Sequence, residues 1–91
     1  MEKKKIVIEG IEIEVEGFDP KDHDAVKKHI ASCFTEIREA AGMNRKDFSD
    51  WLGIPYRTMQ EWERARRAMP EYVLRLIAYK VYHEKVMGTK N

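Results

Sequence analysis

Hydrogen-bonding side chains are concentrated in the stretch GIPYRTMQEWERARR, residues 53–67. Arg57 carries a planar guanidinium that can make two parallel hydrogen bonds, and the amide of Gln60 offers a donor and an acceptor side by side. Arginine pairs in this way with guanine, and glutamine with adenine, at the edges of DNA bases. The arginines at positions 64, 66 and 67 follow directly, and their charge suits phosphate oxygens. The stretch therefore indicates contact with a polyanion.

Other side chains capable of chemistry lack the neighbours that catalysis or metal binding needs. His29 and Cys33 lie one helical turn apart, as two metal ligands would, but no third or fourth ligand follows at a suitable spacing. Packing in the core is the favoured interpretation of both. The sequence shows no nucleophile with a base and an orienting group, and no glycine-rich phosphate loop. We therefore expect no enzymatic activity, no metal and no cofactor.

Length and composition predict one small globular protein. The chain has 91 residues, of which 43% are hydrophobic and 36% charged. It has no apolar run of about 20 residues and no secretion signal at its start, and its single cysteine suits a reducing compartment. We therefore expect a cytoplasmic protein without membrane contact. Acidic side chains prevail in residues 1–37 and basic ones in residues 38–80, so a polyanion would contact the second part. Ordinary scatter of surface charge explains the same asymmetry.

The first 18 residues predict a β-hairpin extension. Apolar and acidic residues alternate strictly from Ile11 to Glu16, as in a half-buried strand, and Glu9-Gly10 suits a two-residue turn. The resulting register pairs Ile8 with Ile11 and continues through the pairs Val7–Glu12, Ile6–Ile13, Lys5–Glu14 and Lys3–Glu16. One face is then apolar and the other carries lysine–glutamate pairs. The hairpin either covers the core of its own chain or joins two subunits.

Residues 19–91 show helical spacing and are expected to form the main domain. Asp19 or Asp22 caps a first helix, Pro20 suits its first turn, and Gly42 ends it. The apolar positions of this helix recur every three or four residues: Val26, Ile30, Cys33, Phe34, Ile37 and Ala41. We expect a mainly α fold, a small helical bundle with a helix-turn-helix, preceded by the hairpin.

Two short helices and a longer one complete the bundle. Asn44 caps the first short helix, whose buried positions are Phe48 and either Trp51 or Leu52, and Gly53 ends it. The second short helix runs from position 55 to about position 64, and the last helix from about 70 to 87.

The last helix is apolar over much of its circumference. One face is expected to contain Val73, Leu76, Ile77 and Val81 with Met69, while Tyr72, Tyr79, Tyr82 and Val86 lie around it or on a second face. Either the hairpin or a second subunit must cover so much apolar surface. We expect a homodimer.

The stretch IREAAGMNRKDFSDWLGIPYRTMQEWERARR resembles the Cro/phage-repressor type, or XRE type, of helix-turn-helix DNA-binding protein. The shared features begin with an arginine in the first helix, a turn made of a small residue, a glycine and an apolar residue, and a short helix. A glycine followed by an apolar residue, a recognition helix, a Trp-Glu pair and a basic loop come next. The resemblance covers roughly residues 37–70 and implies a lambda-repressor-like bundle. The N-terminal hairpin lies outside the family's common core.

Packing of the two short helices leaves a narrow outer face. Their inner positions are Phe48, Leu52, Ile54, Met59 and Trp62. Four residues then face outward near the start of the second helix, where such proteins contact bases: Tyr56, Arg57, Gln60 and Glu61. Glu61 either accepts a hydrogen bond from cytosine or repels phosphate.

The resemblance also implies roles for the residues around this face. The expected phosphate ligands are Asn44, Arg45, Arg64, Arg66 and Arg67. At Arg45, members of the family often have glutamine. Arg38 and Glu63 are expected to form a partly buried ion pair with a structural role.

The function implied is that of a sequence-specific, dimeric regulator, a repressor from bacteria or a mobile element. The helix at 55–64 would lie in the major groove of double-stranded operator DNA. Two alternatives remain open. One is an antitoxin that binds a toxin protein and represses its own operon. The other is a protein-interaction module that keeps the fold without binding DNA.

Overall fold

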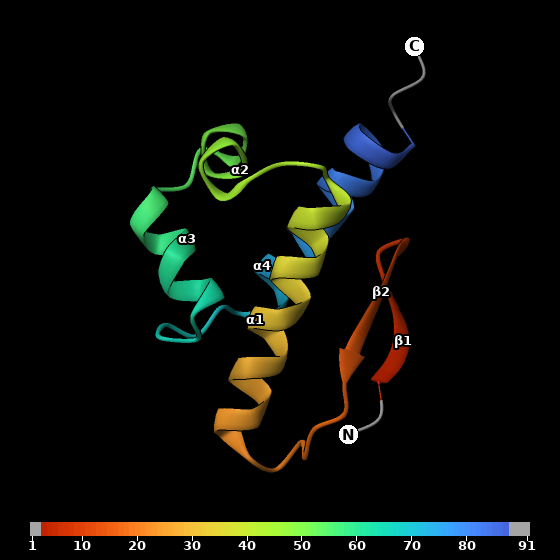
Figure 1. Cartoon of the computed structure of the whole chain (residues 1–91), viewed down its shortest axis with the longest axis vertical. Coiled ribbons are helices and arrows are strands. Elements are labelled where there is room, and N and C mark those ends of the chain that lie inside the picture. Colours follow the sequence, from red (N-terminus) through yellow and green to blue (C-terminus); the bar gives the residue numbers. More distant parts are fainter. Residues whose placement is uncertain (1–2, 88–91) are drawn as a thin grey trace.

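A central helix separates the β-hairpin from the two short helices, as expected of a mainly α fold with an N-terminal hairpin (Figure 1). This computed structural model describes residues 3–87. Helix α4 lies behind α1, and a single π-helical turn, η1, continues it (Figure 1). The elements in chain order are β1 (Lys3–Ile8), β2 (Ile11–Glu16), α1 (His23–Ala40), α2 (Arg45–Leu52), α3 (Tyr56–Glu63), α4 (Glu71–Val81) and η1 (Tyr82–Val86).

The hairpin has the predicted register. Ile8 pairs with Ile11, and the antiparallel ladder continues to Lys3 and Glu16. The turn residues Glu9 and Gly10 have φ angles of 49° and 94°, as a two-residue hairpin turn requires. The apolar side chains of β2 are buried in one cluster with those of the helices, so the hairpin covers the core of its own chain.

Side-chain caps begin α1 and α2. The Asp22 carboxylate accepts hydrogen bonds from two backbone amides at the start of α1, at 3.0 and 3.3 Å. Pro20 therefore precedes the helix and does not lie in its first turn. Asn44 caps α2 as predicted, accepting from the amide of Asp47 at 2.8 Å. Gly53 ends α2 with a left-handed φ of 72°.

The inner face of α4 differs from the predicted one. Leu76 is 64% exposed, so its assignment to the core is wrong. The buried residues of this helix are Leu74, Ile77, Ala78 and Val81. Compared with the predicted orientation, α4 is turned about its own axis. Its inner face contacts α1, and Tyr82, just beyond its end, packs against the hairpin turn. A Cβ atom at Gly10 would lie only 2.8 Å from the ring of Tyr82, so this contact requires glycine.

No helix within residues 3–87 has both the length and the apolar character needed to cross a bilayer.

Candidate nucleic-acid interface

A tight turn between α2 and α3 sets the direction of α3. After Gly53, the amide of Ile54 donates to the carbonyl of Ser49 at 3.0 Å, which closes the end of α2. Pro55 then occupies the N-cap of α3 in an extended conformation, and no side chain caps the first amides of that helix. Helix α3 therefore begins with backbone donors that no side chain engages.

The inner faces of α2 and α3 pack on α1 through aromatic and sulfur-containing side chains. Phe48 and Met59 are both fully buried. The ring of Phe34 on α1 lies 5.7 Å from that of Phe48 and 5.8 Å, edge to face, from that of Trp62. These contacts hold the helix-turn-helix against the central helix, so its opposite face is the one left to solvent.

A buried carboxylate ties α1, α2 and α3 together. The side chain of Glu63 is 3% exposed, and its two oxygens accept from Arg38 Nε at 2.8 Å and from Arg45 Nε at 2.9 Å. Arg38 also donates to the carbonyl of Met43 at 3.0 Å. The pair of Arg38 and Glu63 that the family resemblance implies is thus present, with a second arginine added to it.

Arg45 has a structural partner, Glu63, that the sequence does not indicate. Burial acts to lower the pKa of its guanidinium, but the hydrogen bond and charge of Glu63, with a contribution from Tyr56, raise that pKa overall. Arg45 is therefore a permanent positive charge that links α2 to the end of α3. No sequence pattern marks this contact, because its partner lies 18 positions away and depends on how the two helices cross.

The outer face of α3 holds the four residues expected to contact bases. Tyr56 is 41% exposed, Arg57 is exposed, and Gln60 and Glu61 are half-buried. A carboxylate oxygen of Glu61 accepts from Arg67 Nε at 2.9 Å. Glu61, a candidate for base contact, therefore binds Arg67, a candidate for phosphate contact.

The turn after α3 adds exposed positive charge beside this face. The carbonyl of Glu61 accepts from the amides of Arg66 and Arg67, at 2.8 and 3.3 Å, and Ala65 has a left-handed φ of 58°. Within residues 3–87, three arginines of α3 and the turn form no ion pair: Arg57, Arg64 and Arg66. This unpaired charge is available to an anion.

Asn44 lies at the start of α2 with part of its side chain engaged. Its carbonyl oxygen accepts from the amide of Asp47, the bond that caps the helix. The amide nitrogen of the side chain is the donor that could bind a phosphate oxygen.

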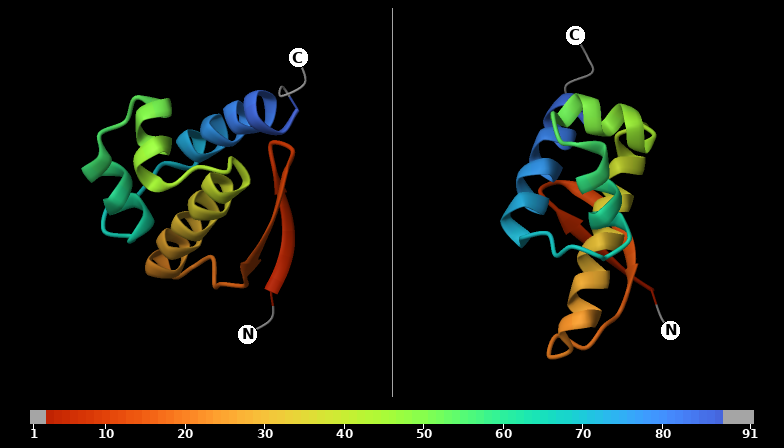
Figure 2. Two further views of the ribbon diagram at one scale, coloured as in Figure 1. Left: turned by 45° about the horizontal axis from the view of Figure 1, so that its top comes forward. Right: turned by 90° about the vertical axis from the view of Figure 1, so that its left-hand side faces the viewer.

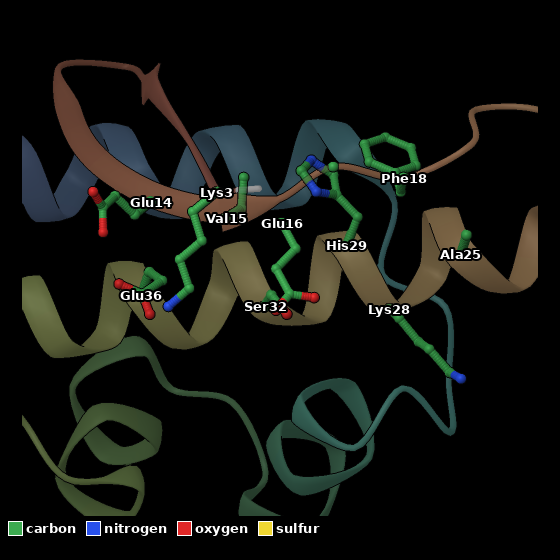
Figure 3. Close-up of a pocket in the computed structure, with 11 residues that line it drawn as sticks. Lys3, Glu14, Val15, Glu16, Phe18, Ala25, Lys28, His29, Ser32 and Glu36 are labelled. Atoms are coloured by element: carbon green, nitrogen blue, oxygen red, sulfur yellow. The ribbon is translucent and has the colours of Figure 1, made fainter. Parts of the chain in front are cut away.

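A concave region lies between the hairpin and α1, away from the outer face of α3 (Figure 3). The ring of Phe18 stacks on His29 at 4.1 Å between centroids. Charged side chains of both signs line the hollow: Lys3, Glu14, Glu16, Lys28 and Glu36. Within residues 3–87, no three His, Cys, Asp or Glu side chains lie close enough together to hold a metal ion.

His29 and Cys33 contact each other beneath this region. The sulfur of Cys33 lies 3.5 Å from Nε2 of His29 and is almost fully buried. Burial raises the pKa of the Cys33 thiol to about 11, with Glu36 adding to the rise, and burial lowers the pKa of His29 despite the opposing charge of Glu71. At neutral pH the pair is a thiol beside a neutral imidazole, which suits packing better than metal binding or nucleophilic chemistry.

None of the protein-family models, curated proteins or solved structures compared with this chain matches it.

Proposed function

We propose that this protein is a sequence-specific DNA-binding regulator of the Cro/phage-repressor helix-turn-helix type, with α3 as its recognition helix. The observation that carries the proposal is the outer face of α3. There, Tyr56, Arg57 and Gln60 reach solvent from a helix that partly buried ion pairs hold to α1 and α2. A rigid support of this kind favours base contacts, which need side chains placed within a fraction of an ångström.

Each group near this face has a separate role in the proposed complex. Arg57 makes two hydrogen bonds to guanine and Gln60 makes two to adenine, while Tyr56 contacts sugar, phosphate or a thymine methyl group. Arg64 and Arg66, which have no ion-pair partner within residues 3–87, bind backbone phosphates together with the side-chain amide nitrogen of Asn44. In this proposal the protein acts as a repressor by occupying its operator.

The pairing of Glu61 with Arg67 refines these roles. The salt bridge directs the carboxylate of Glu61 toward the basic turn, so the proposal gives Glu61 no hydrogen bond to cytosine. Glu61 instead positions Arg67 and keeps phosphate away from the middle of α3. Arg45 contributes through its bond to Glu63 and is not a primary phosphate ligand in this proposal.

Two arginine variants test the proposal, with binding measured by gel shift on a site selected from random DNA. Arg57→Ala should weaken binding by about 1–3 kcal/mol and relax the preference at one base pair. Arg66→Ala is the matched control, because it removes the same side chain from a phosphate contact. It should weaken binding to all sequences alike. It should also make the slope of log binding constant against log salt concentration shallower by about one unit. Equal and unselective losses for both variants would remove the base-contact role of Arg57.

A further inference from the structure

Helix α4 has a second apolar face that the monomer does not use. Tyr72 is 67% exposed, Leu76 64% and Tyr79 55%, and His83 on η1 is exposed as well. These four residues, which we call the α4 seam, are spaced by four, three and four positions. That spacing is the a/d spacing of two-stranded helix pairs. The seam lies opposite the buried face of the same helix.

The surface of the seam is hollowed. Tyr72, Arg75, Leu76 and Tyr79, with Glu9 of the hairpin turn, line a hollow of about 480 Å³. The four residues of α4 are related as i, i+3, i+4 and i+7, which is the arrangement that receives one side chain of a facing helix in knobs-into-holes packing. The hollow therefore has room for a tyrosine or leucine side chain of a second α4 helix.

Charges on both sides of the seam are already neutralised within the chain. Arg75 pairs with Glu9 at 3.4 Å on the hairpin side, and Lys80 pairs with Glu84 at 3.1 Å on the other. A strongly acidic or basic partner would find no excess of the opposite charge here. An identical helix, which is neutral along its own flanks, meets no repulsion.

The exposed area is close to what a specific dimer needs. Aromatic side chains contribute about 150–250 Å² each, so the exposed fractions of the seam amount to roughly 300–400 Å² in one chain. Two chains and the flanks of the seam bring the total near 1,000 Å², which is about the minimum for a biological interface and suits a weak dimer.

We propose that the α4 seam docks on the seam of a second copy of this chain, with the two α4 helices antiparallel. When α3 faces the viewer, α4 forms one edge of the molecule (right-hand view of Figure 2). We place a two-fold axis at that edge, parallel to the line of sight. This axis brings the two seams into contact, and both α3 helices then lie on the same side of the dimer. The use of this dimer on two half-sites rests on the proposed function, whereas the pairing of the seams does not.

The test is the mass of the full-length protein in solution, measured by light scattering and sedimentation equilibrium. The wild type should form a dimer in the micromolar range. Leu76→Glu should raise the dimer dissociation constant at least about 30-fold while leaving the thermal melt of the diluted monomer unchanged. Val7→Glu is the matched control, because Val7 is equally exposed, at 63%, but lies on the hairpin. It should remain dimeric.

Three outcomes would overturn the proposal. These are a wild type that stays monomeric at 100 μM, a Leu76→Glu variant as dimeric as the wild type, and a dimer disrupted equally by Val7→Glu. A monomer whose complex with a co-expressed toxin is lost in Leu76→Glu would assign the seam to that protein instead. The proposals for α3 and α4 can fail separately. A seam-dependent dimer without DNA preference would refute only the function proposed for α3.

Discussion

Apolar packing holds both sides of α1, but only one side adds a network of ion pairs. On one side, the buried carboxylate of Glu63 joins three helices through Arg38 and Arg45. On the other side, aliphatic residues of β2 cover the helix, and Ile11 and Ile13 are almost fully buried (Figure 1). Hydrogen-bonded ion pairs have a preferred direction, whereas apolar burial has almost none.

This difference matches the demands on each side. In the proposed function α3 must have a defined orientation relative to the rest of the protein, which a directional network can provide. A covering hairpin only needs to exclude water. We therefore expect side-chain truncation to have different consequences on the two sides of α1.

The largest effect should follow removal of Arg38. In Arg38→Ala the buried Glu63 keeps one of its two arginine partners, so the cost should lie near the lower end of the about 3–5 kcal/mol for breaking a buried ion pair. The melting temperature should fall by more than about 10 °C, since 1 kcal/mol is worth about 4–8 °C in a small domain. Thermal unfolding followed by circular dichroism measures this loss.

Arg75→Ala is the matched control on the hairpin side. Its pair with Glu9 is exposed and 3.4 Å long, so its removal should cost less than about 1 kcal/mol. Equal melting temperatures for the two variants would show that the contrast between the two sides of α1 is wrong.

A smaller effect should appear on the hairpin side at alkaline pH. Burial raises the pKa of the Cys33 thiol from 9.0 to about 11. The neutral thiol therefore stabilises the folded state fully below pH 9, and this contribution is lost as the pH rises to 11. The loss should be roughly 2 kcal/mol, because one pKa unit corresponds to about 1.4 kcal/mol.

Urea unfolding at several pH values, in the wild type and in Cys33→Ala, isolates this contribution from other groups that titrate in the same range. The stability of the variant should fall less steeply between pH 9 and 11. Parallel curves for the two proteins would contradict the assignment of a buried neutral thiol.

The smallest effect should come from the turn that ends α3. Ala65 has a φ of 58°, a conformation that costs a residue with a Cβ atom about 1 kcal/mol. Ala65→Gly should therefore stabilise the protein by up to about 1 kcal/mol. Ala68→Gly in the same loop is the control, because Ala68 has no positive φ and glycine there should only increase the entropy of the unfolded chain. If both glycine variants were destabilised by similar amounts, the backbone at Ala65 would not be strained.

The hairpin could be predicted from the sequence in detail. Alternation of apolar and acidic residues, a glycine turn and matching lysine–glutamate pairs all specify one register. A shift of one residue would have turned every isoleucine of β2 toward solvent. The caps at Asn44 and Gly53 were equally predictable, because both act on backbone groups within a few residues.

Side-chain contacts between distant elements could not be predicted in this way. Helix α4 carries two apolar stripes, and its own periodicity does not say which of Leu74 and Leu76 faces α1. The packing of Tyr82 on the hairpin turn helps to decide between them. The bond of Arg45 to Glu63 likewise depends on the crossing of α2 and α3. The pair of Arg38 and Glu63 was expected only because of the family resemblance.

Selection of bound sites from a pool of random double-stranded DNA tests whether α3 recognises a DNA sequence. If α3 contacts bases, a short motif containing a guanine should be enriched, and the preference at that position should be lost when Arg57→Ala is used for the selection. A pool that stays random through successive rounds with the wild-type protein would contradict the role of α3 as a recognition helix.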